Sequence, residues 1–442
     1  MKTIIINGAN GYVASNFINK LLTQKYKVIA LVRPSIKFSP TERMKAALAE
    51  SSDDEYVNST NLKVYSYSLL HKDFLIPQEQ LEDTFSEEVD YFHFAASLKF
   101  DFKSKEEIFE TNVGGLGNSI QVFSKFAKFN SRFFFIGTAY SCGRFSGRFE
   151  EKFYPNDDID KFRNYYEQSK RFAENVVKKQ IDNHGLNGHV IRLSQVVGNN
   201  KTGVTKTDYG IFDFTKRIHS LAFRNPNQTV RVHVNPVSTQ NLIPIDTVVN
   251  YLLRAVEVKH IPVIMNFIAK KQVKNIHIIK SISNLLPINI VPEKKFARHE
   301  MTALERIISA GMSFTESYID TNLQFDTSNL DKILMVDGHE ANENTVHKML
   351  EYFIDNLATQ KRKRVIFIGT KKGVKFQYPK PNKKQITLGD ALKNVPESLG
   401  SKYSDEKIKL LKYVPAGGSW VNMPVDIQKK YMGKSFYSSG GR

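Results

Sequence analysis

Short apolar runs alternate with amphipathic stretches along the first 200 residues. Ile4–Ile6 and Val28–Val32 are apolar at every position, as expected of strands buried on both faces of a parallel sheet. Between them, apolar residues at helical spacing predict a helix from Ser15 to Gln24. Further strands are predicted at Leu62–Tyr67, Tyr91–Phe94, Phe133–Ile136 and Val190–Leu193, and helices at Ile108–Phe126 and Tyr166–Gln180. This alternation predicts an α/β fold with a doubly wound, Rossmann-type parallel sheet.

The pattern becomes less regular after about residue 205. Asn241–Asp246 predicts a short strand that leads into a helix at Thr247–Val256, and a last helix is predicted at Glu343–Asn356. We therefore predict a cofactor-binding Rossmann domain over residues 1–204. Residues 205–357 are expected to form a smaller α+β substrate lobe with closing helices, some elements of which return to the Rossmann core.

The composition is that of a globular protein with one cysteine. Hydrophobic residues make up 41% of the 442 residues, and Cys142 alone excludes a disulfide framework. No apolar stretch reaches the roughly 20 residues that a membrane span needs. We expect a cytoplasmic protein without a membrane span and without a metal site, and the sequence does not indicate its oligomeric state.

Positive charge is concentrated at the C-terminal end. Residues 358–442 hold 19 Lys and Arg against 5 Asp and Glu, which accounts for +14 of the total net charge of +18. Such a sharp shift in charge indicates a separate unit with its own partners. A basic segment of this kind makes DNA one candidate partner.

A glycine-rich turn follows the first predicted strand. Gly8-Ala-Asn-Gly11-Tyr-Val-Ala14 lies between a strand and a helix, where backbone N–H groups and the helix N-terminus can bind a pyrophosphate. Arg33 ends the second predicted strand, where an acidic residue would select NAD and an arginine suits the 2′-phosphate of NADP. The sequence therefore favours NADP(H), with NAD as the alternative.

Three further residues are candidates for proton transfer and for contact with a ligand. Tyr166 and Lys170 are four residues apart and so share a helix face, where an ammonium group favours ionisation of a nearby phenol. Thr138 is expected at the carboxyl end of the strand Phe133–Ile136, the edge at which such sheets bind ligands. By contrast, we expect His93 to be a wall residue rather than a catalyst, and Cys142 to pack rather than to act as a nucleophile.

These motifs together resemble the extended short-chain dehydrogenase/reductases, and most closely the branch of thioester reductases and fatty acyl-CoA reductases. The resemblance covers residues 1 to about 355. It rests on the turn at Gly8–Ala14, His93–Ser97, Thr111–Gly115, Gly137–Tyr140, Tyr166–Lys170, Arg192–Gly198 and Asn241–Asp246. The resemblance implies that Tyr166 is the general acid, that Lys170 lowers its pKa and holds the nicotinamide ribose, and that Thr138 orients the carbonyl. The implied cofactor-binding residues are Gly8, Asn10, Gly11, Tyr12, Val13, Arg33, Ala95, Ala96, Asn112, Tyr166 and Lys170.

The resemblance is incomplete, and it leaves alternatives open. Tyr65–Ser68 stands where the family often has an aspartate for the adenine, and Gly137 stands in place of the usual serine. The expected substrate is a small carbonyl compound or thioester, free or bound to a carrier. A nucleotide-sugar epimerase or dehydratase, or a module that binds NADP without turnover, remains an alternative.

The basic segment resembles a different family. Gln360-Lys-Arg-Lys-Arg364-Val, Ile386–Ala391 and Val414–Trp420 are similar to an internal piece of DNA cytosine-5 methyltransferases. That resemblance implies DNA contacts from Gln360, Arg362 and Arg364. The Pro-Cys nucleophile and a second cofactor loop are missing from the sequence, so the segment is not expected to methylate DNA by itself.

Overall fold

The computed structural model describes residues 2–24, 26–51, 60–312 and 322–359, together with residues 412, 413 and 427. Contacts divide the chain into two compact units, residues 1–363 and 364–442. The predicted DNA contacts Gln360, Arg362 and Arg364 lie outside the described residues. The remaining description concerns the first unit.

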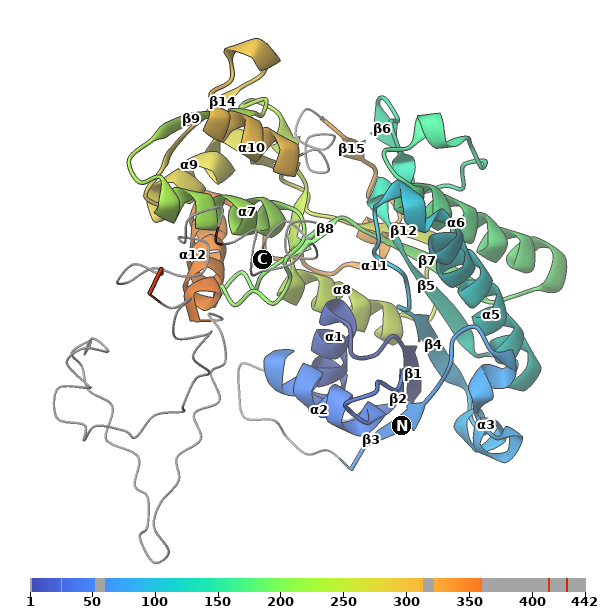
Figure 1. Cartoon of the computed structure of the whole chain (residues 1–442). Coiled ribbons are helices and arrows are strands. Elements are labelled where there is room, and N and C mark those ends of the chain that lie inside the picture. Colours follow the sequence, from blue (N-terminus) through green and yellow to red (C-terminus); the bar gives the residue numbers. More distant parts are fainter. Residues whose placement is uncertain are drawn as a thin grey trace, which may run out of the picture. The chain divides into compact units, whose positions relative to one another are not determined.

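A seven-stranded parallel sheet forms the centre of this unit (Figure 1). Its strands, in spatial order, are β12 (Ile264–Phe267), β7 (Gly188–Leu193), β5 (Arg132–Thr138), β4 (Val89–His93), β1 (Thr3–Asn7), β2 (Lys27–Val32) and β3 (Leu62–Ser66). Every residue of the four strands β1, β4, β5 and β7 is buried, which agrees with the apolar runs at their centres. The predicted doubly wound fold is confirmed, although β12 was not predicted.

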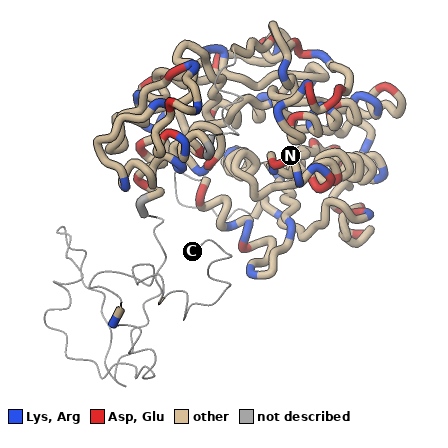
Figure 2. Tube along the Cα trace, turned by 45° about the horizontal axis from the view of Figure 1, so that its top comes forward, with Lys and Arg blue, Asp and Glu red and all other residues tan. Residues whose placement is uncertain are grey.

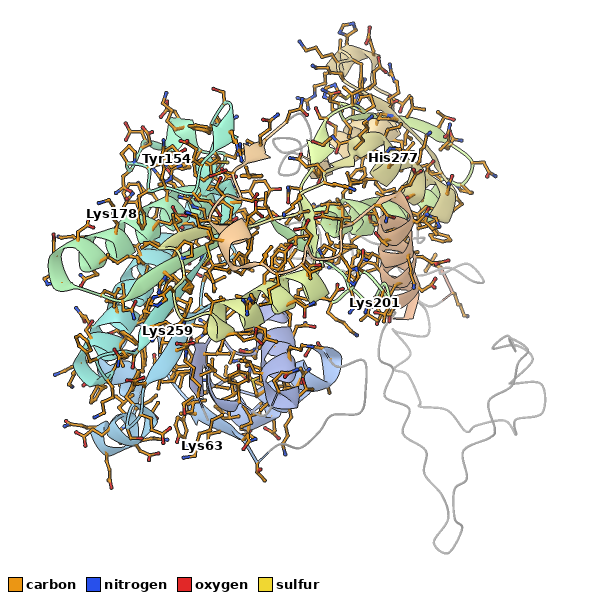
Figure 3. All side chains as sticks on the ribbon, turned by 180° about the vertical axis from the view of Figure 1, so that it is seen from behind. Lys63, Tyr154, Lys178, Lys201, Lys259 and His277 are labelled. Carbon is orange, nitrogen blue, oxygen red and sulfur yellow. The ribbon has the colours of Figure 1, made fainter. Side chains whose placement is uncertain are left out.

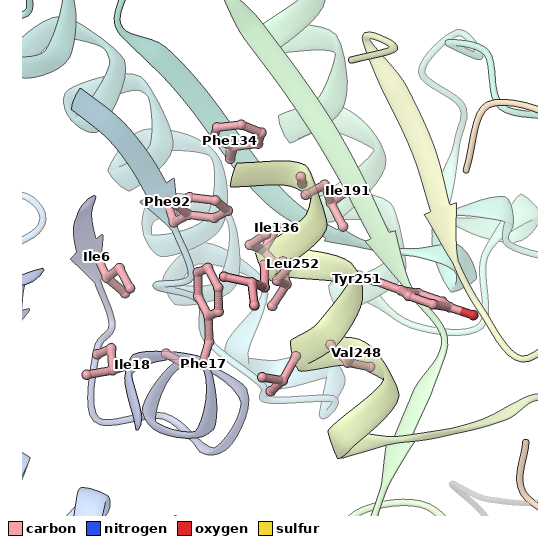
Figure 4. Close-up of a cluster of buried hydrophobic side chains, with 14 of the residues drawn as sticks. Ile6, Phe17, Ile18, Phe92, Phe134, Ile136, Ile191, Val248, Tyr251 and Leu252 are labelled. Carbon is pink, nitrogen blue, oxygen red and sulfur yellow. The ribbon is translucent and has the colours of Figure 1, made fainter. Parts of the chain in front are cut away.

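Helices cover both faces of the sheet. One face carries α1 (Tyr12–Thr23), α2 (Pro40–Ser51) and α8 (Ile245–Glu257), and the other carries α3 (Gln78–Thr84), α5 (Gly115–Phe126) and α6 (Tyr165–His184). Figure 4 shows how α1 and α8 close the first face. Phe17 of α1 packs edge-on against Phe92 of β4, with ring centroids 5.1 Å apart, and Phe92 stacks on Phe134 of β5 at 4.3 Å. Helix α8 belongs to the stretch after residue 205, so it is one of the elements that return to the Rossmann core.

A second lobe is built on its own apolar core. It consists of α7 (Ile211–Arg224), β9 (Thr229–His233), α9 (Asn275–Leu285), β14 (Asn289–Glu293), α10 (Ala303–Met312) and α12 (Glu343–Thr359). Strands β9 and β14 pair in parallel although about 60 residues of chain separate them. Strand β8 (Gln195–Val197) pairs with β11 (Leu242–Pro244) where the chain passes between the two lobes. Figure 3 shows both lobes from behind, with Lys63 on β3 and His277 on α9.

The predicted helix at Ile108–Phe126 is not continuous. The structure has α4 (Lys105–Phe109), then a π-helical turn over Glu110–Gly114, then α5. A π-turn adds one residue to the helical repeat, and such turns are frequent at functional sites. Here the turn contains Asn112, whose side chain is buried. The helical period alone did not reveal this insertion.

Short elements complete the described part of the chain. Small pairs of strands are formed by β6 (Arg148–Phe149) with β15 (Gln324–Phe325) and by β10 (Thr239–Gln240) with β13 (Val273–Lys274), and α11 (Leu330–Ile333) is a single turn. Single 3₁₀ turns occur at Lys72–Leu75, Phe102–Ser104, Ala139–Cys142, Ile159–Lys161 and Arg298–Glu300. Within the described residues, no helix has the length and apolar character needed to cross a membrane. Basic and acidic residues are interspersed along this part of the chain (Figure 2).

Candidate active site

A cavity of about 400 Å³ lies at the carboxyl ends of the central strands, between the sheet and the second lobe. Eight of the predicted site residues line it: Gly8, Gly11, Tyr12, Val13, Ala96, Thr138, Tyr166 and Lys170. Four others do not line it: Asn10, Arg33, Ala95 and Asn112. The structure therefore brings the glycine turn, the threonine and the Tyr/Lys pair together in one cavity.

The glycine turn lies very close to the loop that follows β4. Gly8 has a φ of +61°, and a Cβ at this position would lie 2.8 Å from the backbone nitrogen of Ala95. Any larger residue would push these two segments apart. Gly11 is the N-cap of α1 and provides no side-chain cap for its first turn, so the helix start presents backbone N–H groups. These features fit the pyrophosphate of a dinucleotide.

Asn7 fixes the loop that faces this turn. Its side-chain oxygen accepts hydrogen bonds from the backbone N–H groups of Phe94 and Ala95, at 2.9 and 3.1 Å. Its amide nitrogen lies 2.9 Å from Nδ1 of His93, whose side chain is fully buried. Burial lowers the pKa of His93 to about 3, so this ring is neutral at physiological pH. His93 is thus a packed residue, and it does not line the cavity as a wall residue would. The role of Asn7 was missed, because only the tertiary structure brings β1 and the β4 loop together.

Asn112 connects the same loop to α6. Its side-chain oxygen accepts a hydrogen bond from the N–H of Ser97 at 2.7 Å, and its amide nitrogen donates to the hydroxyl of Ser169 at 2.9 Å. Ser169 precedes Lys170 on α6. Asn112 therefore lies behind the wall of the cavity and holds two of its segments in place.

Tyr166 and Lys170 occupy the first turns of α6. Asn164 caps this helix by accepting a hydrogen bond from the N–H of Glu167 at 2.9 Å. The Nζ of Lys170 donates to the carbonyl oxygen of Ile136 at 3.0 Å and lies 5.9 Å from the centre of the Tyr166 ring. The helix thus directs the amine toward the end of β5 and leaves both side chains in the cavity.

The electrostatics of this pair differ from the expectation drawn from their spacing. Burial lowers the pKa of Lys170 to about 8, against the opposing effect of Glu174. Burial, together with Glu167 and Tyr209, raises the pKa of Tyr166 above its usual value. In this structure the Lys170 amine donates a hydrogen bond to the carbonyl oxygen of Ile136 and not to the Tyr166 hydroxyl. The Tyr166 phenol therefore remains protonated at neutral pH. Tyr166 is therefore in the form that donates a proton.

Thr138 ends β5, as predicted. Its hydroxyl donates to the carbonyl oxygen of Leu193 at 3.2 Å and accepts from the N–H of Tyr140 at the same distance. The 3₁₀ turn that follows is tied to α6, because Ser141 donates to Glu174 at 2.8 Å. Glu174 also forms a fully buried ion pair with Arg192 of β7, at 2.7 Å. This network fixes α6 against β5 and β7, and with them the relative positions of Thr138, Tyr166 and Lys170.

Two arginines lie at the outer end of the glycine turn. Arg33 is exposed just after β2, and the guanidinium of Arg43 on α2 donates to its carbonyl oxygen. Both side chains favour the ionised form of Tyr67, although burial raises the pKa of this residue to about 12. The Tyr67 hydroxyl in turn accepts a hydrogen bond from the N–H of Gly8 at 3.2 Å. Arg43 and Tyr67 were both missed, because neither position carries a sequence signal of its own.

The wall opposite the turn comes from the second lobe and is mainly apolar, although Lys206, Gln240 and Asn275 also line the cavity. It contains five buried side chains from α7, α9 and the end of β9: Ile211, Phe214, Val234, Ile278 and Ile279. Residues 206–211 also line the cavity, as one continuous segment leading into α7. Cys142 lies outside this lining, and burial raises its pKa to about 12, which agrees with a packing role. The sequence had given no specific indication of this wall.

Comparison with known proteins gives two separate likenesses. The family model described as "Male sterility protein", a NAD-binding domain, matches residues 6–252. The terminal R domain from the myxalamid PKS-NRPS biosynthetic pathway has a TM-score of 0.66 and 14% identity, over 81% of this chain and 92% of its own. UDP-glucuronic acid 4-epimerase from Bacillus cereus, in complex with NAD, has a TM-score of 0.56 and 15% identity, over 82% of this chain and 99% of its own.

The second likeness is to Type II methyltransferases and covers a smaller part of the chain. The Type II methyltransferase M.PspPI of Psychrobacter sp. (strain TA137) is 38% identical over 122 residues, which are 25% of this chain and 28% of that enzyme. The chain spans about a quarter of the length of the curated relatives it matches. The resemblance to a piece of a methyltransferase, predicted from the sequence, is therefore confirmed.

Proposed function

The chain belongs to the male sterility protein family of NAD-binding domains, and from this membership we propose that it is an NADP(H)-dependent reductase. Its substrate is an acyl thioester, an aldehyde or a related carbonyl compound. The observation that carries this proposal is the shared cavity, in which the glycine turn, Thr138, Tyr166 and Lys170 face an apolar wall. A hydride donor and a proton donor that meet at one carbonyl group are the requirements of such a reduction.

The cofactor would be held by the segments around the turn. The N–H groups at the start of α1 suit its pyrophosphate, and the absence of a side chain at Gly8 lets the turn lie directly against the loop at Ala95. Arg33 and Arg43 supply positive charge at the outer end, which suits a 2′-phosphate and supports NADP(H) over NAD. When bound, the nicotinamide supplies the hydride.

The chain's own residues supply the proton and the orientation. Tyr166, kept protonated by its burial, donates its phenolic proton to the carbonyl oxygen as the hydride arrives. Lys170 is cationic below about pH 8 and holds the nicotinamide ribose. Thr138 can donate to the substrate oxygen only by giving up its bond to the carbonyl of Leu193, so we expect it to contribute less than Tyr166.

The apolar wall favours an acyl or alkyl substrate over a nucleotide sugar. A nucleotide sugar carries a diphosphate and several hydroxyl groups, all of which need hydrogen-bond partners when they leave water. Ile211, Phe214 and Ile278 offer none, and they would stabilise a hydrocarbon chain by about 25 cal/mol for each Å² removed from water. The polar groups on this side of the cavity are too few to satisfy a diphosphate and a sugar together, and they include Lys206, Gln240 and Asn275. This wall is the reason for preferring the reductase to the epimerase alternative.

A substrate panel tests the proposed function. The full chain is incubated with NADPH and, in turn, acyl-CoA thioesters of several lengths, aliphatic aldehydes, and UDP-sugars, and NADPH oxidation is followed by absorbance. We expect oxidation that depends on a thioester or an aldehyde, and none with the UDP-sugars. Conversion of a UDP-sugar without net oxidation would show an epimerase instead, and NADPH binding without any turnover would show a binding module.

The likeness to Type II methyltransferases favours a second candidate activity, DNA binding by the basic segment 358–442. Methyl transfer is not part of this candidate, because the only cysteine of the chain is the buried Cys142. If the segment binds DNA phosphates, its affinity should fall steeply with salt concentration. Each phosphate that is neutralised lowers the binding constant about eightfold for every tenfold rise in salt.

Gel-shift titration of the full chain with duplex DNA at two salt concentrations measures this dependence. We expect the double variant Arg362→Glu, Arg364→Glu to bind more weakly than the parent. A charge-matched control is Lys178→Glu, Lys259→Glu, which changes two lysines on the Rossmann part of the chain (Figure 3). Absence of binding at low salt, or equal loss in both double variants, would remove this candidate.

A further inference from the structure

The ring of Tyr166 is held by another ring rather than by a hydrogen bond to its hydroxyl. Phe100, in the loop after β4, meets Tyr166 edge-on, with ring centroids 5.3 Å apart and an interplanar angle of 70°. The amine of Lys170 lies on another side of the ring, 5.9 Å from its centre. Among the described residues, the structure shows no hydrogen bond to the Tyr166 hydroxyl. The direction in which this hydroxyl points therefore depends on what the ring packs against.

Phe100 also contacts the second lobe. Its ring meets that of Tyr209 at 6.3 Å and 71°, again edge-on. Tyr209 belongs to the segment 206–211 that covers the cavity, and all three rings line that cavity. Phe100 is thus in contact with the proton donor on one side and with the substrate wall on the other.

Tyr209 precedes a glycine with a left-handed backbone conformation. Gly210 has a φ of +61°, and a Cβ there would lie 1.8 Å from the side-chain amide nitrogen of Gln195. A residue with a side chain would be strained at this position, so the turn of the segment past the cavity favours glycine. The Tyr209 ring, which is 48% exposed, lies edge-on to Phe100 and occupies one side of it.

We propose that Phe100 is a positioning residue, which sets the direction of the Tyr166 hydroxyl toward the substrate carbonyl by edge-on packing against Tyr166 and Tyr209. The inference rests on the proposed function, since it assigns a further residue to the same site. Edge-to-face ring pairs have a preferred geometry, so loss of one ring releases the other to several orientations. A misdirected donor lowers the rate of proton transfer without weakening cofactor binding.

The neighbouring Phe102 provides a matched control. It lies on the same loop, is 63% exposed, and meets Tyr165 edge-on at 5.4 Å and 71°. It does not line the cavity and does not contact Tyr166. Phe102→Leu thus removes an equivalent ring contact from the same helix turn, one residue away from the proton donor.

The kinetic test compares Phe100→Leu, Phe100→Tyr and Phe102→Leu in the full chain, with an acyl-CoA thioester and NADPH. We expect Phe100→Leu to lower kcat about tenfold, with little change in the KM for NADPH. A tenfold change in rate corresponds to the interaction energy of about one aromatic pair. Phe100→Tyr keeps the ring and should restore kcat, and Phe102→Leu should stay within about twofold of the parent, as expected of an exposed position. Equal kcat values for Phe100→Leu and Phe102→Leu would overturn the proposal.

A second measurement does not depend on turnover. Ionisation of tyrosine is followed by absorbance during a pH titration of the parent and of Phe100→Leu. The same titration is run on each protein with Tyr166→Phe added, and the difference between the two curves is the contribution of Tyr166. Loss of the Phe100 ring admits water to a phenol whose pKa is raised by burial, by Glu167 and by Tyr209, so the pKa should fall. An unchanged pKa of Tyr166 would overturn the proposal for Phe100, and this result does not require an active enzyme. Inactivity of the parent on the substrate panel would count against the proposed function alone. If Phe100→Leu does not fold, Phe100→Met, which keeps the bulk without the ring, takes its place.

Discussion

Replacing Tyr166 by phenylalanine is expected to lower kcat/KM for the reduction by roughly two to four orders of magnitude, the usual contribution of a positioned general acid. The substitution removes one oxygen atom and leaves the ring that packs against Phe100. The cavity keeps its shape, and NADPH binding should be retained. Initial rates of NADPH oxidation, together with a fluorescence titration of NADPH binding, measure both quantities.

Tyr165 offers a matched control for this variant. It is the preceding residue of α6, its ring contacts Phe102 and Phe109, and it does not line the cavity. Tyr165→Phe removes the same oxygen one position away and should leave kcat/KM within about twofold, as expected of a substitution outside the site. Equal rates in the two variants would show that Tyr166 is not the proton donor.

The pH dependence of the parent gives a further readout on the same assay. Lys170 has a pKa lowered to about 8 by burial, so its amine is cationic below that pH and neutral above it. Because we propose that the cation is the form that holds the ribose, kcat/KM should fall as the pH rises through about 8. Lys170→Arg keeps its positive charge throughout this pH range, so the fall in kcat/KM above pH 8 should disappear. The variant should also have a lower kcat/KM than the parent, because the geometry of a guanidinium differs from that of an amine. A rate that rises through the same range in the parent would contradict the assigned role of Lys170.

Replacing Arg33 by aspartate is expected to reverse the cofactor preference. Arg33 follows β2, and its carbonyl oxygen accepts a hydrogen bond from the guanidinium of Arg43, so we propose that both side chains contribute to a 2′-phosphate site. Loss of a charge-assisted hydrogen bond, worth about 1.5–3 kcal/mol, should lower kcat/KM with NADPH about ten- to a hundredfold. The new carboxylate can accept hydrogen bonds from the ribose hydroxyls of NADH, so the rate with NADH should rise.

Lys37 is the control for Arg33. It lies on the same exposed loop, and Lys37→Asp makes the same change of charge. Its ratio of NADPH to NADH activity should remain close to that of the parent, whereas Arg43→Ala should lower the ratio in the same direction as Arg33→Asp. If Arg33→Asp and Lys37→Asp alter the ratio equally, the effect is one of general charge and not of a phosphate site.

The parts of the site that the sequence predicted are those with a local pattern. The turn at Gly8 follows an apolar strand, and Tyr166 and Lys170 share a helix face, so their chemistry is visible over a few residues. The fold was predictable for the same reason, because buried parallel strands are short apolar runs. The prediction of one continuous helix at Ile108–Phe126 was wrong, because a π-turn interrupts it around Asn112. Such a turn leaves the average helical pattern of the sequence intact.

The remaining site residues depend on contacts that are distant in sequence. Asn7 acts through Phe94 and Ala95, more than 80 residues away, and Phe100 acts through Tyr209 on the second lobe. Neither residue has an unusual neighbourhood in the sequence. The second lobe itself is built from β9 and β14, which pair across about 60 residues, and local periodicity carries no information on that pairing.

The cavity is built by two parts of the chain that have separate cores. Its floor comes from the sheet and the turn around Gly8, and its far wall comes from α7 and α9 of the second lobe. Substitutions at positions such as Phe214 or Ile279 alter the wall while the turn at Gly8, Thr138, Tyr166 and Lys170 keep their places. The shape of the cavity can thus be changed from one core without disturbing the other.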